Sequence, residues 1–511
     1  MKPQHYDVLI IGAGLSGIGM ACHMKKDCPK KSYAIIERRD SLGGTWDLFK
    51  YPGIRSDSDM YTFGYNFRPW KGSKVLADGP SIKNYIKETA EEYGVLENIK
   101  YGLKVVRSSW STSKGLWTLS VENEKTGEKQ QFTANFVVNA TGYYNYDEGY
   151  KPDYPGEADY QGQLIHPQHW PEDLDYSGKK IVVIGSGATA VTVVPAMADD
   201  AAHVTMLQRS PTYMLPIPMV DPVTQQLQRF LPDMLTYRIT RTRNITALRT
   251  MYQASRRSPK AVRRLLLGIV RKQLGNSVDM RHFSPKYNPW DERLCAVSDG
   301  DLFKALRSGK ASMETDSIKR FTEKGILLES GKELEADIVI SATGLNIQLM
   351  GGIDVRIDNK KVKINETLVY KNVLASGIPN AGLIFGYTNL PWTLKADIAA
   401  EYICRLLNHM DKHGYTKVEP RDLEGCATDE TVMGALQSGY IQRAADKLPR
   451  QGTKAPWAMT QDYIRDTKTA RYSRIEDDQL WFDDCDPKTT PRASKRQSAL
   501  DTLRNVMPSR A

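Results

Sequence analysis

Short apolar runs recur along the chain and predict strands that are buried on both faces. The first pair reads YDVLIIG (6–12) and YAIIER (33–38), and a second pair reads KKIVVIG (179–185) and HVTMLQR (203–209). The segment between the members of each pair is long enough for one helix, which favours parallel strand–helix–strand units. We therefore predict an α/β fold that contains two Rossmann-like dinucleotide-binding domains.

A glycine-rich turn follows the first predicted strand. Gly12, Gly14 and Gly17 fit the pattern G-x-G-x-x-G, and Ser16 lies within it. Such glycines permit a tight turn, let a pyrophosphate approach the backbone, and let the helix pack close to the strand. The helix N-terminus offers free N–H groups to phosphates. Glu37 follows about twenty residues later at a strand end, where a carboxylate binds a ribose 2′-OH and repels a 2′-phosphate.

The second pair of strands carries the same pattern with two changes. The turn has alanine at the third glycine position, and the next strand ends in a cation instead of an acid. Arginine pairs with a 2′-phosphate through two hydrogen bonds, so this unit is predicted to prefer NADP(H). The alternative is an ordinary surface arginine. The residues assigned to this second nucleotide site are Gly185, Ser186, Gly187, Ala188, Thr189, Ala190, Arg209 and Ser210.

Two nucleotide units of opposite 2′ preference indicate electron transfer between two cofactors, with NADPH reducing FAD. The phrases VVNATG (137–142) and VISATG (339–344) predict the two crossings between the domains, although both could be ordinary buried strands that end at glycine. We therefore expect an FAD domain in two parts, 1–142 and 339–485. An NADPH domain, 143–338, is inserted between them, and 486–511 is expected to be a flexible tail.

Composition is that of an ordinary globular protein, with 41% hydrophobic and 25% charged residues. No apolar run reaches the roughly 18 residues of a membrane-spanning helix. The first strand begins so early that we expect no signal peptide. The six cysteines form no C-x-x-C pair, which indicates a reducing, cytoplasmic location.

Positive charge is concentrated in one segment, for which we predict a helical insert at about 225–285. Thirteen Lys or Arg and two acids lie between Arg229 and Arg281, whereas the whole chain has a net charge of +10. One predicted helix, 259–274, has an apolar stripe of Val262, Leu265, Leu266, Ile269, Val270 and Leu274, with Arg263, Arg264, Arg271 and Lys272 largely on the other face. The stripe packs on the NADPH domain in one interpretation and contacts a membrane surface in the other. No nucleic-acid-binding module accompanies the charge, so we expect no nucleic-acid partner.

Two long gapped motifs resemble those of class B flavoprotein monooxygenases. The Baeyer–Villiger pattern F-x-G-x-x-x-H-x-x-x-W-P is matched by Tyr160, Gly162, His166, Trp170 and Pro171, with tyrosine in place of phenylalanine. A second pattern, G-G-x-W-x-x-x-x-Y-P-G-x-x-x-D, begins at Gly43 and ends at Asp57. The resemblance covers about 6–470 and is greatest to the subgroup of the ethionamide-activating and long-chain alkane-degrading monooxygenases.

The resemblance implies an NADPH- and O2-dependent enzyme that acts through a flavin C4a-peroxide. Ketones become esters or lactones by this chemistry, and sulfides gain oxygen. Arg293 matches the active-site arginine and Asp57 the acid that orients it, although the two residues could instead tie a loop to the core. Gly44, Thr45, Trp46 and Val105 are assigned to the flavin site together with Asp57.

Other functions fit the sequence less well. We expect no metal at His166 and His169, because no further ligand accompanies them at a suitable spacing. A disulfide oxidoreductase needs a cysteine pair that the chain lacks. The alternatives that stay open are an N- or S-oxygenase, an alkane-oxidising monooxygenase and a non-catalytic flavoprotein. We expect a monomer or weak homo-oligomer that acts on small hydrophobic substrates and O2.

Overall fold

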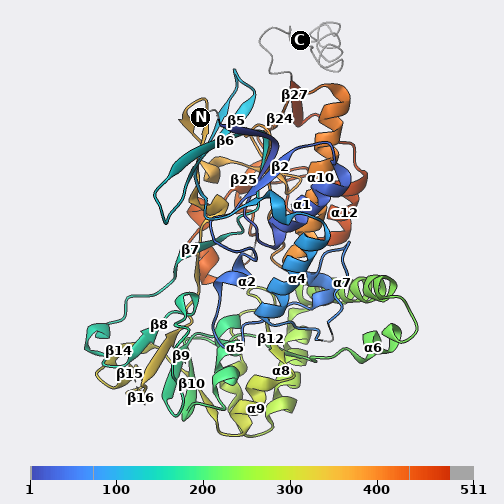
Figure 1. Ribbon diagram of the computed structural model, residues 1–511. Helices are drawn as coiled ribbons and strands as arrows, with labels where there is room; N and C mark the ends of the chain where they lie inside the picture. Colours follow the sequence, from blue (N-terminus) through green and yellow to red (C-terminus); the bar gives the residue numbers. More distant parts are fainter. Residues whose placement is uncertain (1–2, 73, 435, 437, 484–511) are drawn as a thin grey trace, which may run out of the picture.

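The computed structural model describes residues 3–72, 74–434, 436 and 438–483, and it divides into two sheet-centred halves (Figure 1). The larger sheet has eleven strands, and its main path runs β20-β19-β4-β5-β6-β1-β2-β3. Its strands are β1 (Gln4–Ile11), β2 (Tyr33–Ile36), β3 (Ile99–Lys100), β4 (Lys104–Ser111), β5 (Leu116–Glu122), β6 (Lys129–Asn139), β19 (Asp354–Ile357), β20 (Lys360–Lys361), β21 (Val369–Tyr370), β22 (Leu374–Ala375) and β23 (Ala381–Leu383).

The two faces of the larger sheet follow from the alternation of side chains along β1. Val8 and Ile10 face the core beneath the helices α1 (Leu15–Asp27), α4 (Gly79–Glu92) and α10 (Trp392–His413). Leu9 and Ile11 face the opposite cluster, which contains Trp110 and Trp117 of the antiparallel strands β4 and β5. Since both faces are covered, the first apolar run is buried as predicted.

The smaller sheet has five parallel strands in the order β13-β10-β9-β17-β8. They are β8 (Gln163–Ile165), β9 (Lys180–Ile184), β10 (His203–Gln208), β13 (Ala311–Thr315) and β17 (Ile338–Ser341). Helices α5 (Ala188–Met197) and α9 (Asp301–Arg307) pack in the core of this half. The predicted α/β fold with two Rossmann-like units is thereby confirmed.

Shorter ribbons and helices complete the structure. The ribbons pair β7 (Tyr144–Gly149) with β18 (Leu345–Ile347), β11 (Met214–Ile217) with β12 (Cys295–Ser298), β24 (Lys417–Pro420) with β27 (Leu480–Asp483), and β25 (Ala427–Thr431) with β26 (Arg450–Gly452), while β14 (Ile318–Thr322), β15 (Gly325–Leu328) and β16 (Glu333–Glu335) form a meander. The remaining α-helices are α2 (Thr45–Leu48), α3 (Met60–Phe63), α6 (Pro222–Gln228), α7 (Asp233–Arg257), α8 (Pro259–Leu274), α11 (Gly439–Gln442) and α12 (Tyr463–Tyr472).

The chain crosses between the halves twice, and the two crossings pair with each other as the antiparallel ribbon β7–β18. The second crossing begins after β17, whose four residues all pair with β9 of the smaller sheet. The expected boundary at 338/339 therefore falls inside a strand, and the smaller sheet keeps three more residues than predicted. The predicted tail, 486–511, lies outside the described residues.

The basic insert spans both halves. Helix α7 packs on the larger half, where Arg241 Nη1 donates to the carbonyls of Tyr61 at 2.8 Å and Gly64 at 2.7 Å. Helix α8 packs on the smaller half through Val262, Leu266, Val270 and Leu274, all buried. Two further cations of the insert pair with acids outside it, Arg249 with Asp462 and Arg256 with Asp291, each at 2.8 Å.

The membrane interpretation of α8 is wrong for most of its stripe. Four of the six apolar residues are buried against the protein, and only Leu265 is strongly exposed, at 62%. Arg263 is not on a free charged face either, because its guanidinium donates to Tyr213 Oη at 2.6 Å. Among the described residues no helix is long and apolar enough to cross a bilayer.

Candidate active site

A cavity of about 350 Å³ lies where the two halves meet. Its walls come from the first glycine turn, the segment around α2, the end of β6, the start of α5, and the segments before β12 and α10. Of the residues predicted for the flavin and its chemistry, those that line it are Gly12, Gly14, Ser16, Glu37, Gly44, Thr45, Trp46, Asp57, Val105 and Arg293. The structure thus brings together residues that lie far apart in the sequence.

The first glycine turn is shaped by close backbone contacts. Gly12 has φ of +102°, and a Cβ there would lie 2.8 Å from the carbonyl oxygen of Ala140. A Cβ on Gly17 would lie 1.8 Å from the carbonyl oxygen of Gly12, so the helix can approach the strand only with glycine at this position. Gly17 itself does not line the cavity but lets α1 begin where its N–H groups face it.

Glu37 follows β2 and reaches back to the glycine turn. Its Oε2 accepts from Ala13 N at 2.6 Å and its Oε1 from Arg39 N at 2.8 Å. Burial raises the pKa of this carboxyl, and the two backbone donors oppose that rise. Each oxygen keeps a second lone pair, so the fixed carboxylate can still accept a hydrogen bond from a ribose hydroxyl.

The segment around α2 forms the opposite wall. Gly44 has φ of +58°, and a Cβ there would lie 3.0 Å from Gly14 Cα. The turn at Gly43 and Gly44 is therefore in contact with the first glycine turn. Thr45 Oγ1 lies 3.3 Å from the hydroxyl of Tyr146, and the Trp46 ring packs edge-on against Phe63 at 5.6 Å. The segment around α2 thus packs directly against the first glycine turn and the residues that follow β6.

The second glycine turn lies mostly outside this cavity. Gly185 has φ of +142°, and a Cβ there would lie 2.3 Å from the carbonyl oxygen of Ala342, whereas the Cβ position of Gly187 is open. Ala190 is buried, and Arg209 and Ser210 are exposed directly after β10. Only Ala188 and Thr189, at the start of α5, reach the flavin-side cavity, so they join the two predicted nucleotide sites.

Arg293 has a buried Nε without a hydrogen-bond partner among the described residues. The same is true of Nη2 of Arg55, which lines the same cavity but is held by Asp301 through its Nη1. Arg293 lies two residues before β12 and lines the cavity. Burial opposes its charge, but Tyr143, Tyr440 and Asp57 around it together raise its pKa. A fixed cation with a free buried donor is well suited to an anionic ligand or transition state.

The predicted pair between Asp57 and Arg293 is not formed. The described residues include no ion pair between them within 4.0 Å, and Asp57 is exposed and accepts from Ser58 Oγ at 3.2 Å. Asp57 therefore acts on Arg293 only at longer range. In the same loop it is Arg55 that makes a contact to the smaller half, with Nη1 2.6 Å from Asp301 Oδ2.

Aromatic residues that the sequence analysis missed surround Arg293. The hydroxyls of Tyr143 and Tyr144 lie 2.8 Å apart, and the Tyr143 ring stacks on Trp392 at 5.0 Å. Trp392 Nε1 donates to Ser16 Oγ at 2.8 Å and so ties α10 to α1. The tyrosines could have been found, because they directly follow the predicted strand end VVNATG, but no local pattern indicates Trp392.

The residues of the Baeyer–Villiger pattern lie outside the cavity, in the smaller half, and His166 among them contacts the crossings between the halves. His166 Nε2 lies 3.2 Å from the carbonyl oxygen of Gly344, and Gln168 N donates to His166 Nδ1 at 3.2 Å. A Cβ on Gly149 would lie 1.9 Å from the His166 ring.

The other residues of this pattern pack within the smaller half. Tyr160 Oη donates to the Ala336 carbonyl at 2.9 Å, and Trp170 packs on the core of the smaller half. Gly162, in close contact with the Asp337 carbonyl, and Pro171 complete the pattern.

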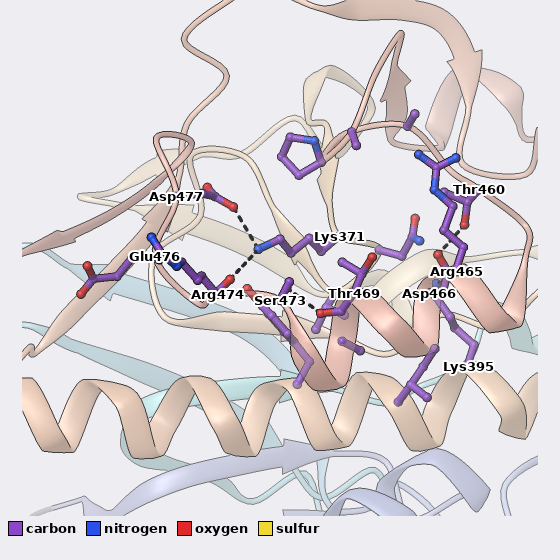
Figure 2. A pocket seen from close by; sticks show the side chains of 18 of the residues that line it. Lys371, Lys395, Thr460, Arg465, Asp466, Thr469, Ser473, Arg474, Glu476 and Asp477 are labelled. Atoms are coloured by element: carbon purple, nitrogen blue, oxygen red, sulfur yellow. Dashed lines mark hydrogen bonds and ion pairs between the residues drawn. The ribbon is translucent and has the colours of Figure 1, made fainter.

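A second cavity, of about 490 Å³, lies between α10 and α12 (Figure 2). Its lysines are already paired, Lys395 with Asp466 at 2.6 Å and Lys371 with Asp477 at 2.9 Å. It contains none of the glycine turns and none of the predicted site residues. We therefore assign the chemistry to the first cavity.

Comparison with known proteins agrees with this geometry. The flavin-binding monooxygenase-like model matches residues 74–390, and an NAD(P)-binding Rossmann-like model matches residues 10–78. The chain belongs to the flavin-binding monooxygenase-like family. This flavin monooxygenase is 57% identical to MymA of Mycobacterium tuberculosis over 94% of its own length and 98% of the relative. It is 53% identical to AlmA of Acinetobacter baylyi over 94% of this chain and 96% of the relative. It is 50% identical to the FAD-containing monooxygenase EthA of Mycobacterium tuberculosis over 94% of this chain and 98% of the relative.

Solved structures share the fold at low sequence identity. A steroid monooxygenase bound to NADP superposes with a TM-score of 0.73 at 18% identity, over 94% of this chain and 99% of that one. A cyclohexanone monooxygenase bound to ε-caprolactone gives 0.71 at 19% identity, over 94% and 100%. The predicted family resemblance and enzyme class are confirmed.

Proposed function

We propose that this enzyme uses FAD and NADPH to insert one oxygen atom of O2 into hydrophobic ketones. A ketone, O2, NADPH and a proton then give an ester or lactone, NADP+ and water. Sulfides are proposed as secondary substrates of the same cavity. The observation that carries the proposal is the unpartnered Nε of Arg293 inside the glycine-lined cavity.

The walls of the cavity suit both the cofactor and an apolar substrate. Glu37 and the glycine turns would hold the FAD nucleotide, and bound FAD supplies the activation of O2. Phe63, Leu390 and Pro391 add apolar surface that favours a hydrophobic substrate. Arg209, at the end of β10, would select NADPH by its 2′-phosphate.

The residues around Arg293 supply the polar chemistry. Its permanent charge, in a cavity of low dielectric, stabilises negative charge that develops during oxygen insertion. Burial raises the pKa of Tyr143 and that of Tyr144, so both hydroxyls stay protonated and can donate. The stack of Tyr143 on Trp392 adds an apolar wall, which would help to keep water from the reacting groups.

The test is the product formed by purified holoenzyme with NADPH and ¹⁸O2. A panel of linear ketones, cyclic ketones, sulfides and alkanes is supplied, and products are measured by gas chromatography with mass detection. We expect esters or lactones that carry one ¹⁸O atom. Oxidation of sulfides or alkanes without any ester would instead support an N- or S-oxygenase or an alkane-oxidising enzyme.

Arg293→Ala tests the assigned cation. The variant should keep its FAD, consume NADPH and release hydrogen peroxide, while ester formation falls by about 100-fold or more. Arg320→Ala, at an exposed position on β14, is the matched control and should behave as wild type. Normal ester formation by Arg293→Ala would show that another group stabilises the developing charge.

A further inference from the structure

Three potential metal ligands meet at the C-terminal end of α10. His409 and His413 lie four residues apart on the helix, and Glu476 approaches from the segment between α12 and β27. One ligand atom from each residue lies within 4.8 Å of the others. His409 Nε2 is 2.9 Å from Glu476 Oε1, and the two imidazole centroids are 4.4 Å apart. Two imidazoles and a carboxylate thus face one point on the surface.

The surrounding residues hold this arrangement in place. Gly414, with φ of +71°, ends the helix and turns the chain so that the Tyr415 ring stacks on His413 at 5.7 Å. The Tyr415 hydroxyl donates to Glu476 Oε1 at 3.3 Å, and Phe482 of β27 packs against His409 at 5.6 Å. An apolar wall and a hydrogen bond to the carboxylate are the usual outer partners of a metal site.

The three side chains do not take part in the ion pairs of the second cavity. Glu476 is at the edge of the second cavity, but its carboxylate points away from Lys371 (Figure 2). Lys371 pairs with the neighbouring Asp477, which leaves Glu476 for the histidines. None of the three residues lines the flavin-side cavity.

We propose that His409, His413 and Glu476 bind one divalent transition-metal ion of the zinc type. Imidazole nitrogen suits zinc, nickel and copper, whereas magnesium and calcium prefer oxygen ligands alone. Ligand atoms about 2 Å from such an ion lie roughly 3.3 Å apart. The separations that reach up to 4.8 Å must therefore close, while the 2.9 Å contact between His409 and Glu476 opens slightly. His413 is exposed and Glu476 is only half-buried, so both side chains are free to make this adjustment. Water completes the coordination.

The ion would join the end of α10 to the segment before β27. Helix α10 begins at Trp392, beside the flavin-side cavity, and ends at His413. A ligand that binds the folded state alone raises stability by mass action. We therefore expect the metal to stabilise the holoenzyme against heat without being needed for catalysis.

The experiment uses untagged, chelator-treated holoenzyme and Zn²⁺, measured by isothermal titration calorimetry. We expect one equivalent to bind and the thermal midpoint to rise, with no effect of Mg²⁺ or Ca²⁺. His413→Ala and Glu476→Gln should each weaken binding at least 10-fold and abolish the rise. His5→Ala, an exposed histidine on the larger sheet, is the matched control and should bind as wild type.

Cu²⁺ offers a second measurement that does not depend on stability. Electron paramagnetic resonance of the 1:1 complex should show hyperfine coupling to two imidazole nitrogens, reduced to one in His413→Ala. Absence of binding below about 1 mM Zn²⁺ would overturn the proposal. So would equal Zn²⁺ affinity of wild type, His413→Ala and Glu476→Gln, which would place the ion on other residues.

Discussion

At the scale of single residues, the proposed preference for NADPH rests on one exposed cation, Arg209. A charge-assisted contact between Arg209 and a 2′-phosphate contributes about 1.5–3 kcal/mol, or roughly 10- to 150-fold in affinity. Arg209→Ala should therefore raise the KM for NADPH by that factor and leave the KM for NADH nearly unchanged. Steady-state kinetics with both nucleotides measures this, and an equal rise for both would remove Arg209 from the site.

Local sequence could predict the positions of residues that depend on a single turn and its neighbouring strand. Gly12, Gly17 and Glu37 occupy positions fixed by one turn and the strand next to it, so spacing alone predicts where they lie. The expected contact between Asp57 and Arg293 failed because it joins two loops from different halves. Its distance depends on how the halves meet, which no local pattern encodes.

At the scale of the element, the helical spacing of apolar residues in α8 predicts that the segment is a helix. It does not predict which of these residues are buried. The apolar stripe is real, but Leu266 is 2% exposed and its neighbour Leu265 is 62% exposed. Leu266→Ala should lower the free energy of unfolding by about 2–5 kcal/mol, because it leaves a buried cavity. Leu265→Ala, the matched control, should change it by less than about 0.5 kcal/mol.

Thermal or urea unfolding of the two variants decides between the possible orientations of α8. A larger loss in Leu265→Ala would mean that the helix is rotated and that its stripe faces outward. Vesicle binding by the wild type is not expected through this stripe, since its main residues pack against Tyr213 and the core of the smaller half.

At the scale of the whole molecule, three helices from distant parts of the chain meet at one buried ionic cluster. His23 of α1 lies 3.2 Å from Asp27 and 3.8 Å from Asp397 of α10, and Arg241 of α7 lies 3.4 Å from Asp397. Burial disfavours the charged imidazole, but its hydrogen bond to Asp27 and the nearby charge of Asp397 prevail and raise the pKa of His23 to about 9.

This cluster predicts a pH-dependent stability. The unfolded pKa of His23 is near 6.5, so its contribution is complete below that pH and is lost as the pH rises through about 9. The loss is at most about 3 kcal/mol. The thermal midpoint of the wild type should exceed that of His23→Gln most at pH 6, with the difference nearly gone above pH 9. A difference that stays constant with pH would contradict a charged His23.

The fold class could be predicted at this scale because each strand–helix–strand unit is contiguous in sequence. The predicted start of the second crossing, at 339, is three residues too early, because β17 runs to Ser341. The sequence does not show where a buried strand ends and a crossing begins. The bridging role of the insert was not predicted, because α7 and α8 pack on different halves through residues of similar composition.

The pairing of the two crossings has a mechanical consequence. A two-stranded ribbon bends and twists easily, but its ladder resists stretching and sliding. With β7 and β18 hydrogen-bonded to each other and His166 packed across them, the two crossings form one short connection between the halves. The basic insert joins the halves at a second place, through α7 on the larger half and α8 on the smaller. A tilt of one half against the other would therefore have to move this insert as well as the ribbon.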